Sequence, residues 1–128
     1  MLRSSVTSYL VSVNNLLIAY SESFENLQLH VINVEHPGTI EKSMQFNSSI
    51  TALASYQEMV LIAFSNSSNT QPQYGVIALD PVTLKQTLLV DQANKQAKGY
   101  ARALTIVGNK LYVGTDDSVQ VFALNLDL

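Results

Sequence analysis

The stretch LYVGTDDSVQVFAL, residues 111–124, decides the fold of this chain. Two apolar runs flank a polar segment, and apolar and polar side chains alternate in the second run. This pattern is typical of two antiparallel β-strands joined by a tight turn. Two earlier segments copy its first half, LLIAYSE at residues 16–22 and VLIAFSN at residues 60–66. The chain is therefore repetitive, and the repeat predicts an all-β fold.

The repeats align without gaps when they start at residues 6, 50 and 101. A third strand follows each hairpin, and a fourth strand follows in the first two repeats. We therefore expect about eleven strands in repeats 6–49, 50–100 and 101–128, as antiparallel four-stranded units of a single domain over 1–128. The last unit lacks its outer strand. The positions that coincide are Leu16, Val60 and Leu111, the small residues Ala19, Ala63 and Gly114, and the turn residues Asn14, Glu58 and Asn109.

The composition argues against several classes of function. The chain has 128 residues, of which 47% are hydrophobic and 13% charged, and its formal net charge is −3. Without a basic field, we expect no binding to nucleic acid. No apolar run approaches the ~20 residues that cross a bilayer, and the N-terminal segment lacks the pattern of a signal peptide. We therefore expect no membrane insertion and a cytoplasmic location.

Residues that could carry chemistry are sparse. The chain has no cysteine, which removes disulfides, thiolate nucleophiles and zinc–thiolate sites. His30 and His36 are its only histidines, and with Glu35 they offer too few ligands for a metal. The motif Gly-x-Ser-x-Gly is missing, and the five glycines lie too far apart to form a phosphate-binding loop. We therefore predict no catalytic, metal or cofactor-binding residue, no cofactor and no enzymatic activity.

Two segments carry a resemblance to a known class of repeats: GNKLYVGTDDSVQVFAL at residues 108–124 and GVIALDPVTLKQ at residues 75–86. They resemble the β-propeller blades of WD-repeat, quinoprotein and citron-homology proteins. The resemblance implies four-stranded blades around a central channel, where neighbouring backbones approach each other. It also implies that the small residues Ala19, Ala63 and Gly114 lie at such close approaches.

Three blades, the last lacking a strand, are too few for a ring, since propellers have four to eight. Three explanations remain open. The chain belongs to a longer propeller whose other blades lie on another polypeptide or beyond this sequence; or two copies form a six-bladed ring; or the sheets stack as a sandwich without closing. In an open arc, strand edges and apolar faces would be left without a cover.

The expected function is a non-enzymatic protein–protein interaction or scaffold module, part of a larger propeller or multi-subunit assembly. The alternative is part of an enzymatic or ligand-binding propeller whose site needs residues from missing blades. The expected partner is a protein, the remaining blades on another chain, or a second copy. Arg102 replaces the threonine found at its aligned positions, which indicates a salt bridge or a partner contact. The candidate contact residues are Phe24, Tyr74 and Tyr100, expected to be exposed, with Arg102, Val119, Val121 and Leu126.

Overall fold

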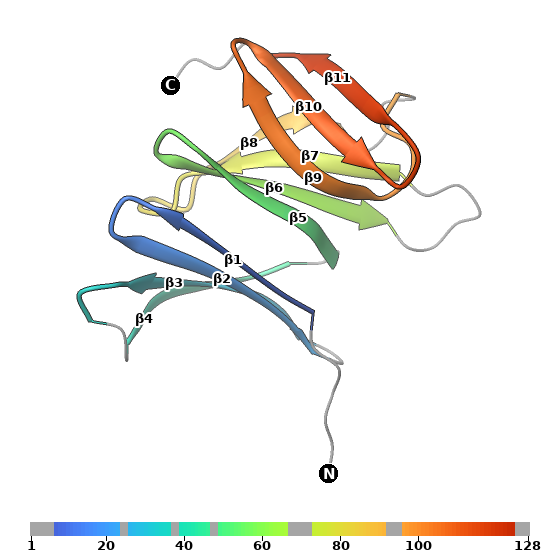
Figure 1. The fold of residues 1–128 in the computed structure, drawn as a ribbon. Helices are drawn as coiled ribbons and strands as arrows, with labels where there is room; N and C mark the ends of the chain where they lie inside the picture. Colours follow the sequence, from blue (N-terminus) through green and yellow to red (C-terminus); the bar gives the residue numbers. More distant parts are fainter. Residues whose placement is uncertain are drawn as a thin grey trace.

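The computed structural model describes residues 7–23, 26–36, 39–46, 49–66, 73–91 and 96–124, which form eleven β-strands and no helix. The strands make three antiparallel sheets of four, four and three strands (Figure 1). This confirms the predicted fold class and strand number. The first sheet contains β1 (Thr7–Val13), β2 (Leu16–Ser23), β3 (Asn26–Asn33) and β4 (Ile40–Gln45). The middle sheet contains β5 (Ser49–Tyr56), β6 (Met59–Asn66), β7 (Gln73–Leu79) and β8 (Gln86–Val90). The third sheet contains β9 (Ala101–Val107), β10 (Lys110–Thr115) and β11 (Val119–Ala123).

A two-residue turn joins the first two strands of every sheet. Asn14, Gln57 and Gly108 begin these turns, with φ angles of 54°, 54° and 62°. Glycine and asparagine accept this left-handed backbone more readily than most residues. The three turns are therefore equivalent points of the repeat, and they fix how the repeats correspond.

These turns correct the gapless alignment of the first repeat. When Asn14 is placed on Gln57, Ile18 corresponds to Leu61 and not to Ile62. The second and third repeats keep the alignment that the sequence predicted. The difference is a single residue, but it moves every side chain of a strand to the opposite face of its sheet.

The small residues of the three repeats consequently do not share one position. Ala19 corresponds to Ile62 and Val113, whereas Ala63 and Gly114 do correspond to each other. The expectation that all three mark one close approach of backbones is therefore wrong. The similarity of the segments LLIAYS and VLIAFS concealed the shift.

The sheets stack in chain order, with the middle sheet between the other two (Figure 1). Their first strands lie together, because β5 contacts both β1 and β9. We call the face that carries the equivalent positions Ile18, Leu61 and Tyr112 the forward face of each sheet, and the face that carries Leu17, Val60 and Leu111 the rear face. The stack does not close on itself within the described residues.

One apolar core lies between the forward face of the first sheet and the rear face of the middle sheet. Its fully buried side chains include Ile18, Tyr20, Leu29 and Val31 from the first sheet, and Ile50, Val60, Ile62 and Leu79 from the middle sheet. The Tyr20 hydroxyl accepts a hydrogen bond of 3.2 Å from the backbone N–H of Ile50. The Lys42 ammonium also donates to the carbonyl of Val82, so polar links join the same two sheets.

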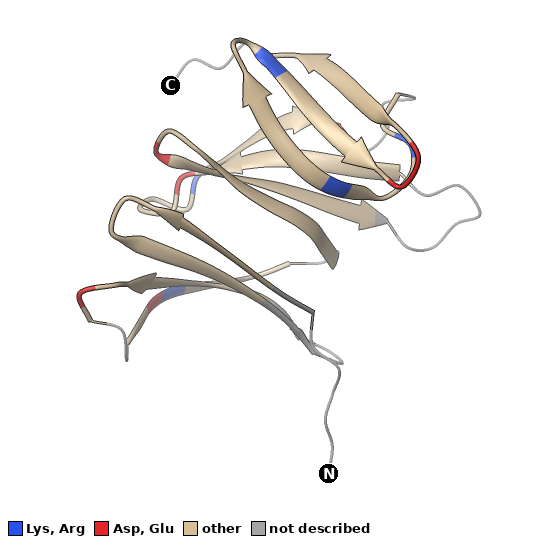
Figure 2. Cartoon of the chain, viewed as in Figure 1, with Lys and Arg blue, Asp and Glu red and all other residues tan. Residues whose placement is uncertain are grey.

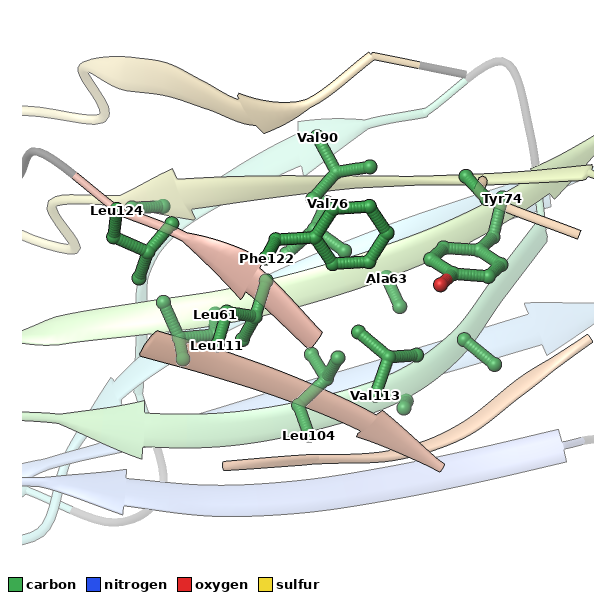
Figure 3. Packing of buried hydrophobic residues seen from close by; sticks show 14 residues of the cluster. Leu61, Ala63, Tyr74, Val76, Val90, Leu104, Leu111, Val113, Phe122 and Leu124 are labelled. Carbon is green, nitrogen blue, oxygen red and sulfur yellow. The ribbon is translucent and has the colours of Figure 1, made fainter. Parts of the chain in front are cut away.

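A second core lies between the forward face of the middle sheet and the rear face of the third sheet (Figure 3). It includes Ala52, Leu61, Ala63, Tyr74, Val76 and Ala78 from the middle sheet, and Leu104, Leu111, Val113 and Phe122 from the third sheet. The middle sheet is thus buried on both faces, which explains the nearly unbroken apolar run QYGVIAL of β7. Both interfaces join a forward face to a rear face.

The middle sheet contains one position where a side chain would not fit. Gly75 on β7 lies opposite Phe64 on β6. A Cβ atom at Gly75 would lie 2.9 Å from Phe64 Cε2, which is closer than side-chain carbons pack. The glycine therefore allows the phenylalanine ring to lie over β7.

Charged side chains mostly lie at turns and strand ends, and the strand surfaces are largely uncharged (Figure 2). Among the described residues, no helical segment has the length and apolar character needed to cross a membrane.

Candidate interaction surfaces

The forward face of the third sheet has no described sheet packed against it. The register of β9, β10 and β11 places nine residues on this face: Ala103, Thr105, Val107, Lys110, Tyr112, Gly114, Val119, Val121 and Ala123. Val119 is 68% exposed and Val121 is 46% exposed. Isolated exposed valines are ordinary, but two on one strand of a sheet face with a single charged residue, Lys110, form a candidate binding surface.

The positions of these two valines are buried in the other sheets. Their equivalents are Leu29 and Val76 for Val119, and Val31 and Ala78 for Val121. All four equivalents are at most 1% exposed, because the following sheet covers them. The third sheet therefore presents to solvent the positions that form an interface elsewhere in the molecule.

The rear face of the first sheet is uncovered in the same way. It presents Leu10, Ser12, Leu17, Ala19, His30 and Ile32. Leu10 is 68% exposed, although the equivalent leucines, Leu53 and Leu104, pack into the two cores. Leu17 is half-buried, and its equivalents Val60 and Leu111 are fully buried. The two ends of the stack therefore carry one uncovered forward face and one uncovered rear face.

The outer edge of β11 is the second feature of the third sheet. β11 pairs only with β10, so one of its edges has no strand beside it in the described residues. The backbone groups of Ser118 and Leu124 form hydrogen bonds on the β10 side of the strand. Because bonding alternates along an antiparallel ladder, the backbone N–H and C=O groups of Val119, Val121 and Ala123 point to the free edge. The strand VQVFA has no charge and no proline, the usual devices that prevent edge pairing.

The structure places Tyr74 in the core, so the expectation that it is exposed is wrong. Its side chain is buried under the third sheet, its ring meets that of Phe122 edge-on at 6.3 Å, and its hydroxyl donates to Gln120 Oε1. Burial raises the pKa of the Tyr74 hydroxyl to about 12. The sequence placed this residue at a loop end, but could not reveal that β11 crosses above it.

Arg102 forms the salt bridge that its departure from the repeat indicated. Its Nε atom lies 2.7 Å from Asp116 Oδ1, and both side chains are exposed. The guanidinium group also lies over the half-buried ring of Tyr100, 5.8 Å from the ring centroid. A partner contact at Tyr100 or Arg102 stays a prediction. Phe24 and Leu126 lie outside the described residues.

The described residues contain no group of three or more metal-ligating side chains. His30 Nδ1 lies 2.9 Å from Ser43 Oγ on the neighbouring strand, without a carboxylate that would orient the pair. A hollow of about 350 Å³ lies beside β11 and is lined by Gln96, Lys98, Gln120 and Val121. Its polar groups can bind a main chain or side chain that approaches the edge of β11.

The sequence pattern named Val119 and Val121, which the structure shows to be exposed, and their contact with a partner stays a prediction; the pattern did not indicate the rear face of the first sheet. The signal was present in the leucines Leu10, Leu53 and Leu104, which coincide only when the turns define the alignment. The gapless alignment placed Leu10 beside Ala54 and Thr105, and so hid the repeat of this position.

No protein-family model, curated protein or solved structure matches this chain. The function is therefore argued from the geometry of the two uncovered faces and the β11 edge.

Proposed function

We propose that this chain is a set of consecutive β-propeller blades that acts as a non-enzymatic protein-interaction module in a larger assembly. One observation carries the proposal: the two end faces of the stack expose repeat positions that are buried wherever a neighbouring sheet exists. Such faces are built for packing, because the same positions pack twice within the chain.

Three features of the fold support the assignment to propeller blades. Each sheet follows chain order, as in a blade built by successive hairpins. The first strands β1, β5 and β9 lie together, where the inner strands of a propeller would line its channel. The sheets also pack forward face to rear face, which is the relation between neighbours in a ring.

The third sheet offers a protein partner two kinds of contact. A strand can add to the free edge of β11 through backbone hydrogen bonds, and an apolar sheet can cover Val119 and Val121. Lys110 is the one charged residue that the register places on this face, at the start of β10 and opposite Ala123 of β11. The partner should therefore present an apolar, uncharged β-surface, because a buried and unpaired charge would oppose binding.

The proposal is tested by recovering a tagged form of the chain from cells that produce it, and then purifying each associated protein. Every candidate is titrated against the unchanged chain, the double variant Val119→Lys/Val121→Lys, and the control Leu88→Lys. Leu88 is 57% exposed on β8 and belongs to neither end face.

We expect the double variant to weaken binding of a true partner at least about tenfold, because two lysines would be desolvated in the interface. The control should bind like the unchanged chain. A partner that binds all three proteins equally would show that the third sheet is not the interface. A chain with no stoichiometric partner, its own copies included, would refute the interaction function.

A further inference from the structure

We propose that the occupant of the two end faces is a second copy of this chain, bound head to tail. In this arrangement the forward face of the third sheet packs on the rear face of the first sheet of the other copy. The inference rests on the proposed function and names its partner. It follows from the packing rules that the chain obeys internally.

The first step is the polarity of the internal interfaces. The first and middle sheets meet forward face to rear face, and so do the middle and third sheets. The chain leaves uncovered one face of each type, at opposite ends of the stack (Figure 1). A second copy therefore supplies to each end the type of face that covers it inside the chain.

The second step is the match of side-chain size. In the core between the middle and third sheets, small forward-face residues, Ala52 and Ala63, meet the large rear-face residues Leu104 and Leu111. The same sizes recur at the equivalent positions of the uncovered faces. Ala103 and Gly114 are the small forward residues, and Leu10 and Leu17 are the large rear residues. The two free faces thus repeat the small-against-large pattern of an interface that the chain already forms.

The third step concerns Gly114, whose small size the single chain does not require. A Cβ atom at this position would have Ala103 Cβ as its nearest neighbour, at 3.7 Å, which is ordinary contact. Its equivalent Ala63 is fully buried beneath the third sheet. A docked second copy would give Gly114 the surroundings of Ala63. The match is with the interface between the middle and third sheets, since the first sheet carries the buried Tyr20 at this position.

The fourth step is charge. Lys110 is the one charged side chain among the residues named on the two end faces, and it is exposed at the start of β10. Docking that leaves its ammonium group in water would bury no charge from these residues. The two faces therefore carry no like-charge pair that would keep the copies apart.

A contact between two different faces has a defined consequence for assembly. Unlike a twofold contact of one face with itself, it closes into a ring or continues as an open filament. Two copies contribute six sheets, within the number of blades that propellers use. We therefore expect a closed pair with twice the chain mass of 14.0 kDa.

The test measures the mass of the purified chain in solution by light scattering and sedimentation at concentrations up to about 100 µM. Gly114→Val blocks the forward face with a bulky side chain, and Leu10→Glu blocks the rear face with a charge. Leu88→Glu is the matched control, because Leu88 is 57% exposed on β8 and belongs to neither end face. Circular dichroism and the urea midpoint establish that each variant is folded.

We expect the unchanged chain and Leu88→Glu to form pairs, and each blocking variant to raise the dissociation constant at least about tenfold. Mixing the two blocking variants should give a 1:1 complex that binds more tightly than either variant binds itself, through the one interface in which both faces are intact. Leu10→Glu still offers an intact forward face, and Gly114→Val still offers an intact rear face. We expect Gly114→Val to fold, because valine favours a strand and a Cβ atom at this position makes only ordinary contact in the single chain.

Other outcomes would overturn the inference. A monomeric unchanged chain at the highest concentration refutes the second copy as occupant, yet leaves a different protein partner to the titrations described above. A pair that survives Leu10→Glu but not Gly114→Val indicates that the forward face binds itself. A pair that survives both variants places the contact elsewhere.

Discussion

The forward faces of the middle and third sheets are built from the same repeat but lie in different surroundings. Val76 and Ala78 of the middle sheet are covered by the third sheet, whereas the equivalent Val119 and Val121 face solvent. The local sequence barely distinguishes the two pairs, because both consist of small or β-branched apolar residues on alternate positions of a strand. Burial is therefore decided by the presence of a neighbouring sheet and not by the strand itself.

Truncating a side chain should cost more free energy of unfolding on a covered face than on an uncovered face. We expect the largest difference at the repeat position shared by Leu17 and Leu111. Leu111→Ala removes a fully buried side chain from the core between the middle and third sheets, and should lower the free energy of unfolding by about 2–5 kcal/mol. Leu17→Ala, at the equivalent position on the uncovered rear face, should lower it by about 1 kcal/mol.

Urea denaturation, at a chain concentration at which light scattering finds a monomer, measures both effects. Equal losses for the two variants would contradict the distinction between covered and uncovered faces.

Gly75 on the middle sheet and Gly114 on the third sheet allow a second comparison, in which the expected loss of stability is smaller. Gly75→Ala should destabilise the chain by about 1–3 kcal/mol, because the Phe64 ring must move away from the new methyl group. Gly114→Ala, on the uncovered face, should change stability by less than about 0.5 kcal/mol, since its Cβ has room. Thermal and urea unfolding give both values.

A double-mutant cycle with Phe64→Leu identifies the cause. The loss from Gly75→Ala should shrink in the Phe64→Leu background, because the smaller side chain leaves space above β7. An unchanged loss would assign the effect to backbone propensity instead of to the ring.

The smallest expected effect lies where β11 covers Tyr74. Tyr74→Phe removes the hydrogen bond to Gln120 and should lower the free energy of unfolding by about 1 kcal/mol near neutral pH. Burial raises the pKa of the folded-state Tyr74 from 10.0 to about 12, so the buried protonated hydroxyl stabilises the fold below pH 10. This stabilisation is lost as the pH rises from 10 to 12.

The gap in stability between the unchanged chain and Tyr74→Phe should therefore narrow across that pH range. Urea unfolding of both proteins at several alkaline pH values checks this, since the five other tyrosines are present in both and their titration cancels. A gap that stays constant with pH would mean that solvent reaches the Tyr74 hydroxyl.

Much of the fold could be predicted because it depends on local pattern. Alternation of apolar and polar residues marked the strands, and polar turn residues marked the hairpins, so the eleven strands were expected in the right segments. The register of the first repeat could not be read in the same way. Similar apolar strings aligned best one residue out of place, and only the left-handed turns at Asn14, Gln57 and Gly108 revealed the true correspondence.

The candidate surfaces were predictable in part for the same reason. The reading of the last repeat as three strands predicted the free edge of β11 and named Val119 and Val121 as candidate contacts, a role that stays a prediction. The salt bridge of Arg102 followed from its departure from the repeat. The expected exposure of Tyr74 was wrong, because its burial depends on β11, which lies more than forty residues away along the chain.

The sequence by itself determined an all-β repeat of four, four and three strands, because strand period and turn chemistry are encoded within a few neighbouring residues. Only the tertiary structure decided which face of each sheet is covered. Which face is covered depends on the register of each strand to one residue and on how whole sheets stack. The strings LLIAYS and VLIAFS are so alike that the local sequence does not show which register each strand takes. Among the described residues, the same stacking leaves one forward face and one rear face uncovered, and the proposed interaction rests on these two faces.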